Sequence, residues 1–249
     1  MQEFMIIACG CSFTKYKWEC WPKYISWFDK AGEVLNLGNS GSGNETIARL
    51  ANNTVLKYKS KLKKIYIMWS GSDRYEVIDE HQHTKVQAEK TYSRYDPDFN
   101  WSVWIGGHKD KKCHDFYQKN FLNEKHNWFR TLEKILYTQM FLEKHKINYV
   151  MMVMNQHVIN HNSFSNAERA LYNQIDWTTF KFYKDKLGLE EFAKELYPEH
   201  FLNNGDAHPC PYTHYQWTKQ VIFQSNLECP VKEETKLINR TNELNESRS

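Results

Sequence analysis

The chain lacks a strong net charge and a long apolar segment. Its formal charge is +3 over 249 residues, and its lysines cluster only near residues 57–64, where we expect a solvated loop rather than a nucleic-acid surface. The apolar run at residues 4–9 is too short for a secretory leader or a membrane span. We therefore expect no nucleic-acid or membrane partner and a cytoplasmic location, with packaging into a virus particle as an alternative.

The six cysteines lack a regular spacing. In a chain of this length without a secretory leader, such cysteines are typical of reduced thiols rather than of a disulfide framework. Cys9 and Cys11 are two residues apart, but no second Cys or His pair at zinc-site spacing accompanies them. We expect no metal site and no cofactor.

Apolar residues make up only 41% of the chain, but 15% of the residues are aromatic. Large aromatic side chains bury much area each, so a folded core is still expected. No internal repeat divides the sequence. We expect a single domain over residues 1–228, followed by a polar tail at residues 229–249 that is poor in apolar residues and is expected to be disordered.

Short apolar runs alternate with helical patterns along the chain, which is typical of an α/β fold with a parallel sheet. The expected strands are residues 4–9, 33–37, 64–69 and 147–154, and the expected helices are residues 18–31, 45–58, 116–144, 189–196 and 212–225. The pattern breaks down at about residues 81–112, an aromatic-rich insertion that includes Trp101 and Trp104. We expect this insertion to pack near or over the functional site.

Ser12 lies in a small-residue loop that follows the first strand. Parallel sheets place ligands at the carboxyl ends of their strands, although a loop serine is more often a turn or capping residue. A nucleophilic serine needs a base and an orienting acid, which His208 and Asp206 can supply from one loop near the last helix. Cys11 is a competing nucleophile, but its side chain is expected to point away from that of Ser12.

Two further loops follow strands. The glycine-rich loop at residues 38–44 joins a strand to a helix, so its backbone N–H groups can hold an anion or an oxyanion, with a flexible linker as the alternative. The loop at residues 70–76 follows the third strand and contains Ser72, Asp73 and Arg74. Both loops are therefore expected at the same edge of the sheet as Ser12.

In their order, these segments resemble the four sequence blocks of the SGNH, or GDSL-like, hydrolase family. Residues 10–14 are similar to the first block, residues 36–41 to the second, residues 70–73 to the third and residues 206–209 to the last. The resemblance implies a flavodoxin-like three-layer αβα sandwich with a central parallel sheet. It also implies a serine esterase that has Ser12 as nucleophile, His208 as base and Asp206 as its partner.

The resemblance further implies that the backbone N–H groups of Ser12 and Gly41 stabilise the oxyanion. The chain departs from the family pattern at Cys11, where aspartate is usual, and at Ser72, where an asparagine side chain normally donates to the oxyanion. Losing one such donor costs about 10²–10³ in turnover. Either Ser72 substitutes, or Asn44 takes over, or catalysis is weak.

The leading interpretation is a serine hydrolase that removes a small acyl group, such as an O-acetyl group, from a small molecule or a carbohydrate. The candidate substrate-binding residues are Asn44, Asp73, Arg74, Trp101 and Trp104. Acyl transfer to a hydroxyl acceptor would use the same Ser12 and His208. A non-catalytic binding or structural protein, for example a component of a virus particle, is the alternative that suits the altered third block and the polar tail.

Overall fold

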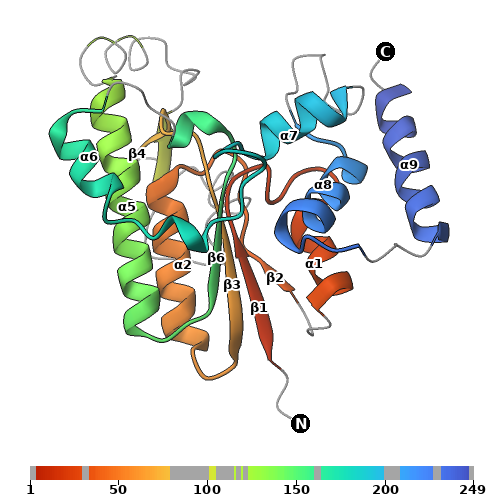
Figure 1. Cartoon of the computed structure of the whole chain (residues 1–249), viewed down its shortest axis with the longest axis horizontal. Coiled ribbons are helices and arrows are strands. Elements are labelled where there is room, and N and C mark those ends of the chain that lie inside the picture. The colour runs from red at the N-terminus through yellow and green to blue at the C-terminus, as the bar shows by residue number, and fades with distance from the viewer. Residues whose placement is uncertain are drawn as a thin grey trace.

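The computed structural model describes residues 4–29, 34–78, 101–104, 115, 119, 123–159, 164–198, 208–226 and 231–246. Its central sheet contains β1 (Met5–Cys9), β2 (Val34–Asn36), β3 (Leu62–Trp69) and β6 (Tyr149–Val153), in the order β2-β1-β3-β6. All neighbouring strands in this sheet are parallel. Helices cover both faces (Figure 1). The predicted three-layer α/β sandwich with a central parallel sheet is therefore confirmed.

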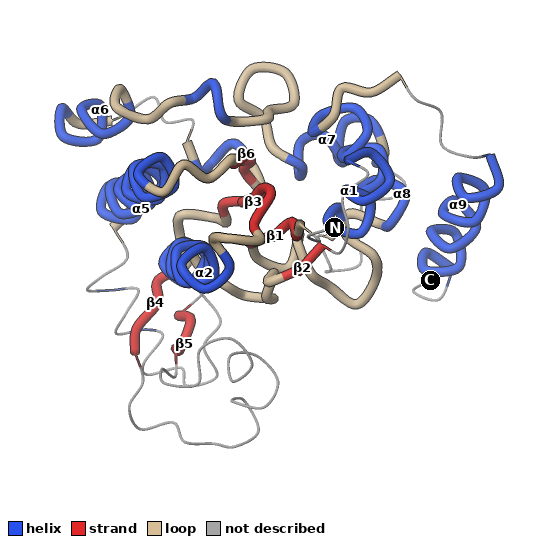
Figure 2. The backbone as a smooth tube through the Cα atoms, turned by 90° about the horizontal axis from the view of Figure 1, so that it is seen from below, coloured by secondary structure: helices blue, strands red, loops and turns tan. Residues whose placement is uncertain are grey.

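The helices divide into two layers. Seen from below, one layer lies on one side of the strands and the second on the other (Figure 2). The first layer contains α2 (Asn44–Tyr58) and α5 (Glu124–Lys144), with α6 (Asn166–Tyr172) packed outside α5. The second contains α1 (Trp21–Asp29), α7 (Leu189–Leu196) and α8 (Pro211–Trp217), which continues as a π-helix over Thr218–Ile222. Among these described helices, none combines the length and the apolar composition that a membrane span requires.

The strands are buried on both faces, which explains why they read as continuous apolar runs. Along β3, Ile67 and Trp69 belong to the core formed with α2 and α5. The alternate residues Tyr66 and Met68 belong to the core formed with α1, α7 and α8. All four residues are completely buried. The sheet therefore separates two apolar cores, one on each of its faces.

A second, two-stranded sheet begins in the loop that follows β3. It pairs β4 (Tyr75–Ile78) with β5 (Trp101–Trp104) in antiparallel register. Part of the predicted insertion is thus a strand, because it returns to pair with the segment that leaves the core. The rest of residues 81–112 lies outside the described residues.

The C-terminal segment contains a helix, α9 (Val231–Glu246), which lies beside α8 (Figure 1). Leu237 and Leu244 pack against buried aromatic and cysteine side chains of the main domain, and Thr241 between them is completely buried. The Thr241 hydroxyl accepts a hydrogen bond from the Tyr212 N–H at 3.3 Å. The predicted disordered tail is therefore wrong for residues 231–246, since three residues at i, i+4 and i+7 form one docking face.

Candidate active site

The loop that carries Ser12 packs directly against the glycine-rich loop. Ser12 is 5% exposed and follows β1. The Asn39 N–H donates to the Gly10 carbonyl at 3.0 Å, and Asn36 Nδ2 donates to the Thr14 carbonyl at 2.9 Å. The carboxyl ends of β1 and β2 therefore bring these two loops together, as expected for neighbouring parallel strands.

The thiol of Cys11 points into the protein. Cys11 is completely buried within the core on the α1 side of the sheet, and its Sγ lies 3.7 Å from Met154 Sδ. A substrate cannot reach this thiol, because the core encloses the side chain. The structure therefore does not support Cys11 as the nucleophile.

His208 packs against the residues that follow Ser12. Its ring stacks on Tyr16, with centroids 4.0 Å apart and an angle of 8°, and meets Phe13 edge-on at 5.3 Å. Trp18 Nε1 donates to the carbonyl of Pro209 at 2.9 Å, which fixes the two segments to one another. The structure thus brings the predicted base to the Ser12 loop. Asp206 lies outside the described residues, and a hydrogen bond between Ser12 Oγ and the imidazole stays a prediction.

A second histidine, His214, lies one helical turn into α8 and is almost completely buried. Burial, and to a smaller extent the nearby His208, lowers the pKa of His214 to about 3. His214 is therefore neutral at neutral pH and has no solvent access through which to exchange a proton with a substrate.

We expect acid to destabilise the protein through His214. An unfolded histidine takes up a proton below about pH 6.5, whereas folded His214 stays neutral until its pKa of about 3. Stability should therefore fall as the pH decreases between these values, by at most about 1.4 kcal/mol per pH unit from this group. Urea titrations of the protein and of His214→Gln between pH 7 and pH 4.5 measure the effect. Parallel pH dependences of the two proteins would contradict it.

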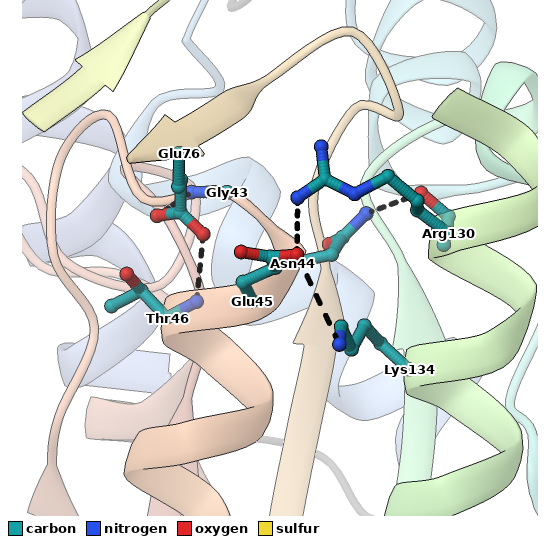
Figure 3. Close-up of polar contacts among 8 residues, drawn as sticks. Gly43, Asn44, Glu45, Thr46, Glu76, Arg130 and Lys134 are labelled. Atoms are coloured by element: carbon teal, nitrogen blue, oxygen red, sulfur yellow. Dashed lines mark hydrogen bonds and ion pairs between the residues drawn. The ribbon is translucent and has the colours of Figure 1, made fainter. Parts of the chain in front are cut away.

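The glycine-rich loop is partly occupied by an internal carboxylate. Glu76 accepts hydrogen bonds from the Gly43 N–H at 2.9 Å and from the Thr46 N–H at 2.7 Å, at the start of α2 (Figure 3). Burial of Glu76 raises its pKa, although these hydrogen bonds oppose that shift. The expected anion cradle at residues 38–44 is thus filled by the protein itself at the Gly43 N–H, and the same carboxylate takes the Thr46 N–H of α2. The sequence gives no sign of this role, because a lone glutamate at the start of a short strand has no distinctive pattern.

Gly41 lies in the same loop and needs to be glycine. Its φ is +86°, a left-handed conformation that other residues rarely adopt, and no heavy atom lies within 4 Å of the place where a Cβ would be. Its backbone therefore faces open space. The oxyanion role of the Gly41 N–H stays a prediction.

Asn44 joins three segments of the chain. Its Oδ1 accepts from the Ser70 N–H at 2.8 Å, and its Nδ2 donates to the Ser70 carbonyl and to Thr131 Oγ1, both at 3.1 Å. The side chain thus has both its amide hydrogens in use. A substrate or an oxyanion could take one of them only in exchange for an existing bond.

The other candidate residues come from the loop at residues 70–76, which follows β3. Ser72 is half-buried and lines a cavity of about 10 Å³ with Asn44 and Arg74. Arg74 Nη1 donates to the Ser42 carbonyl at 2.9 Å, so this arginine supports the glycine-rich loop. Asp73 is exposed, with its carboxylate folded back against Gly71.

Trp101 and Trp104 lie on β5, but the contacts of their side chains are outside what the structure describes. Among the residues that it does describe, no group of three or more His, Cys, Asp or Glu side chains could hold a metal ion.

No family model matches the chain, and no curated protein matches its sequence. A comparison with solved structures finds several that are similar to the chain at low sequence identity. A G-D-S-L-family protein from Desulfitobacterium hafniense DCB-2 is 11% identical, over 86% of this chain and 95% of its own, with a TM-score of 0.44. A variant of Axe2, an acetyl xylan esterase from Geobacillus stearothermophilus, is 15% identical, over 92% of this chain and 100% of its own, with a TM-score of 0.44. LAE5, an α/β hydrolase from the metagenome of Lake Arreo, Spain, is 12% identical, over 85% and 89% of the two chains, with a TM-score of 0.41. Similarity at this level does not transfer an activity, which depends on the side chains of the site.

Proposed function

We propose that the chain is a serine ester hydrolase with Ser12 as the nucleophile and His208 as the general base. The observation that carries this proposal is the contact of the His208 ring with Phe13 and Tyr16, which follow Ser12 closely in the sequence. Segments from the two ends of the domain thus meet where the first strand of a parallel sheet ends. A serine, an imidazole and a glycine-rich loop at one sheet edge are the parts that acyl-group hydrolysis requires.

In the proposed reaction, Ser12 Oγ attacks the ester carbonyl carbon while His208 takes the hydroxyl proton. The N–H groups of Ser12 and Gly41 hold the negative charge that develops on the carbonyl oxygen. His208 then returns the proton to the departing alcohol, which leaves an acyl-enzyme that water hydrolyses. Asp206 fixes the imidazole tautomer and stabilises the imidazolium.

The proposed substrate is a small acyl ester, such as an acetylated carbohydrate. Asp73, Arg74, Trp101 and Trp104 are proposed to contact it, and transfer of the acyl group to a sugar hydroxyl instead of water would use the same Ser12. Comparing product formation with and without a sugar acceptor separates transfer from hydrolysis.

A non-catalytic binding protein is the second candidate, and one observation favours it. The amide hydrogens of Asn44 are engaged within the protein. Ser72 is then the remaining side-chain candidate for the oxyanion donor. A serine hydroxyl offers a single donor with a shorter reach.

The test is labelling of the purified protein with a fluorophosphonate probe. We expect wild type to be labelled and Ser12→Ala to remain unlabelled, because the probe reacts with an activated serine hydroxyl. Ser26→Ala is the matched control, since this hydroxyl lies on α1 and bonds the Lys23 carbonyl at 3.2 Å. Failure to label a folded wild-type protein would favour the non-catalytic candidate.

A further inference from the structure

A cavity of about 310 Å³ lies beside the residues that follow Ser12, and it shares no lining residue with the small cavity at Ser72. It is lined by residues from four parts of the fold: Thr14–Cys20, Lys23 of α1, Asn36 of β2 and Arg240 of α9. Its volume is at the lower end of the range for small-molecule sites, about 300–1,000 Å³. The cavity is therefore large enough for a compact ligand, and α9 supplies part of its wall.

The lining of this cavity is strongly basic. Its charged residues are four cations and one carboxylate: Lys15, Lys17, Lys23, Arg240 and Glu19. Within the described part of the chain, no acidic group lies within salt-bridge distance of Lys15 or Lys23. Arg240 contacts Glu243 at 3.3 Å on the exposed surface of α9, where such a pair is weak. Lys15 and Lys23 thus bring positive charge to the cavity that no acidic side chain of the described residues pairs with, which favours an anionic ligand.

The cavity is also joined to the candidate catalytic histidine. Tyr16 lines the cavity, and its ring stacks on the His208 ring at 4.0 Å. Trp18 lines it too and meets Tyr16 edge-on, with centroids 4.6 Å apart. Small-molecule sites commonly combine aromatic side chains with a few polar or charged groups. The Tyr16 ring would therefore lie between a ligand in this cavity and the His208 imidazole.

From these observations we infer that the cavity binds an anionic carbohydrate through its carboxylate or sulfate group, which Lys15 and Lys23 would contact. This inference rests on the proposed function in one respect, namely that the same molecule carries the ester presented to Ser12. It narrows the substrate class, because neutral acetylated sugars would leave the basic lining without a partner. The binding step itself involves no chemistry at Ser12.

The test uses the full-length Ser12→Ala protein, in which binding is measured without turnover. Isothermal titration compares a trimer of galacturonic acid, a sulfated disaccharide and neutral xylotriose. We expect an acidic sugar to bind at least about tenfold more tightly than xylotriose, because each hydrogen bond to a charged group adds appreciably to affinity. The acidic sugar that binds better distinguishes carboxylate from sulfate. Added salt should weaken its binding.

Lys15→Ala combined with Lys23→Ala should weaken binding of the acidic sugar by about tenfold or more. The matched control combines Lys57→Ala with Lys61→Ala, which removes the same charge from exposed lysines before β3, at the opposite ends of the strands. Equal binding of acidic and neutral sugars, or an equal loss in the control, would overturn the inference. If wild type is labelled by the fluorophosphonate probe, such a result leaves the proposed function intact. If acidic sugars bind but labelling fails, the proposed function falls and the anion site stands.

Discussion

Replacing His208 with alanine is expected to lower kcat/KM for ester hydrolysis by about 10⁴-fold or more, because Ser12 loses the group that removes its proton. His208→Phe should be just as inactive. It should also be the more stable of the two variants, since a phenyl ring can still stack on Tyr16 as the imidazole does. Comparing the two variants therefore separates the loss of the base from the loss of packing.

The matched control for this experiment is His145→Ala. His145 ends α5 and lies before β6, at the amino ends of the strands, where it contacts Lys59 Nζ at 3.4 Å. Hydrolysis of an acetyl ester, followed at saturating and limiting substrate, gives kcat and kcat/KM for each protein. Activity within a few-fold of wild type in both His208 variants would exclude the proposed base.

Asn44→Ala is expected to lower the free energy of unfolding by about 3 kcal/mol, because it leaves the buried backbone of Ser70 and the Thr131 hydroxyl without their partner. Three hydrogen bonds are lost together, and they join the start of α2 to the end of β3 and to α5. Thr131→Val removes only one of them and should cost about 1 kcal/mol. Urea unfolding followed by circular dichroism gives both values.

Labelling of the Asn44→Ala variant with the fluorophosphonate probe distinguishes two roles for Asn44. If the side chain is structural, Asn44→Ala lowers stability, and its labelling at Ser12 survives at temperatures where the variant is folded. A variant that is as stable as wild type but unlabelled would show that Asn44 acts on the substrate or the oxyanion instead.

The parts of the fold that the sequence predicted share one property, which is a local apolar pattern. The strands are buried on both faces, so they appear as short apolar runs. The helix at residues 189–196 has its predicted boundaries, because Gly188 precedes it and Pro198 follows it closely. Helix α9 was missed because its docking face is small and includes a threonine rather than a third large apolar residue.

The candidate site was predictable only in part. The resemblance to the four family blocks predicts that His208 lies near Ser12, and the His208 ring contacts Phe13 and Tyr16 in the loop that carries Ser12. The role of Glu76 was not predictable, because it depends on a β4 segment whose position relative to α2 no local pattern encodes. The hydrogen bonds that Asn44 makes within the protein could not be predicted for a related reason. An asparagine at a helix start has the same sequence signature whether it binds a ligand or its own backbone.

The sheet also determines which residues would respond to a cavity made by a substitution in the core. Ile67 and Met68 are adjacent in the chain, yet they lie in separate compartments on opposite sides of β3. Ile67 instead shares its compartment with Leu132, which is distant in the sequence. A void made by shortening Ile67 would be relieved by movement around Leu132, whereas the hydrogen-bonded sheet would shield Met68 from it. Compensating changes for either residue should therefore arise across the chain, in the helices of its own layer, and not at the neighbouring position.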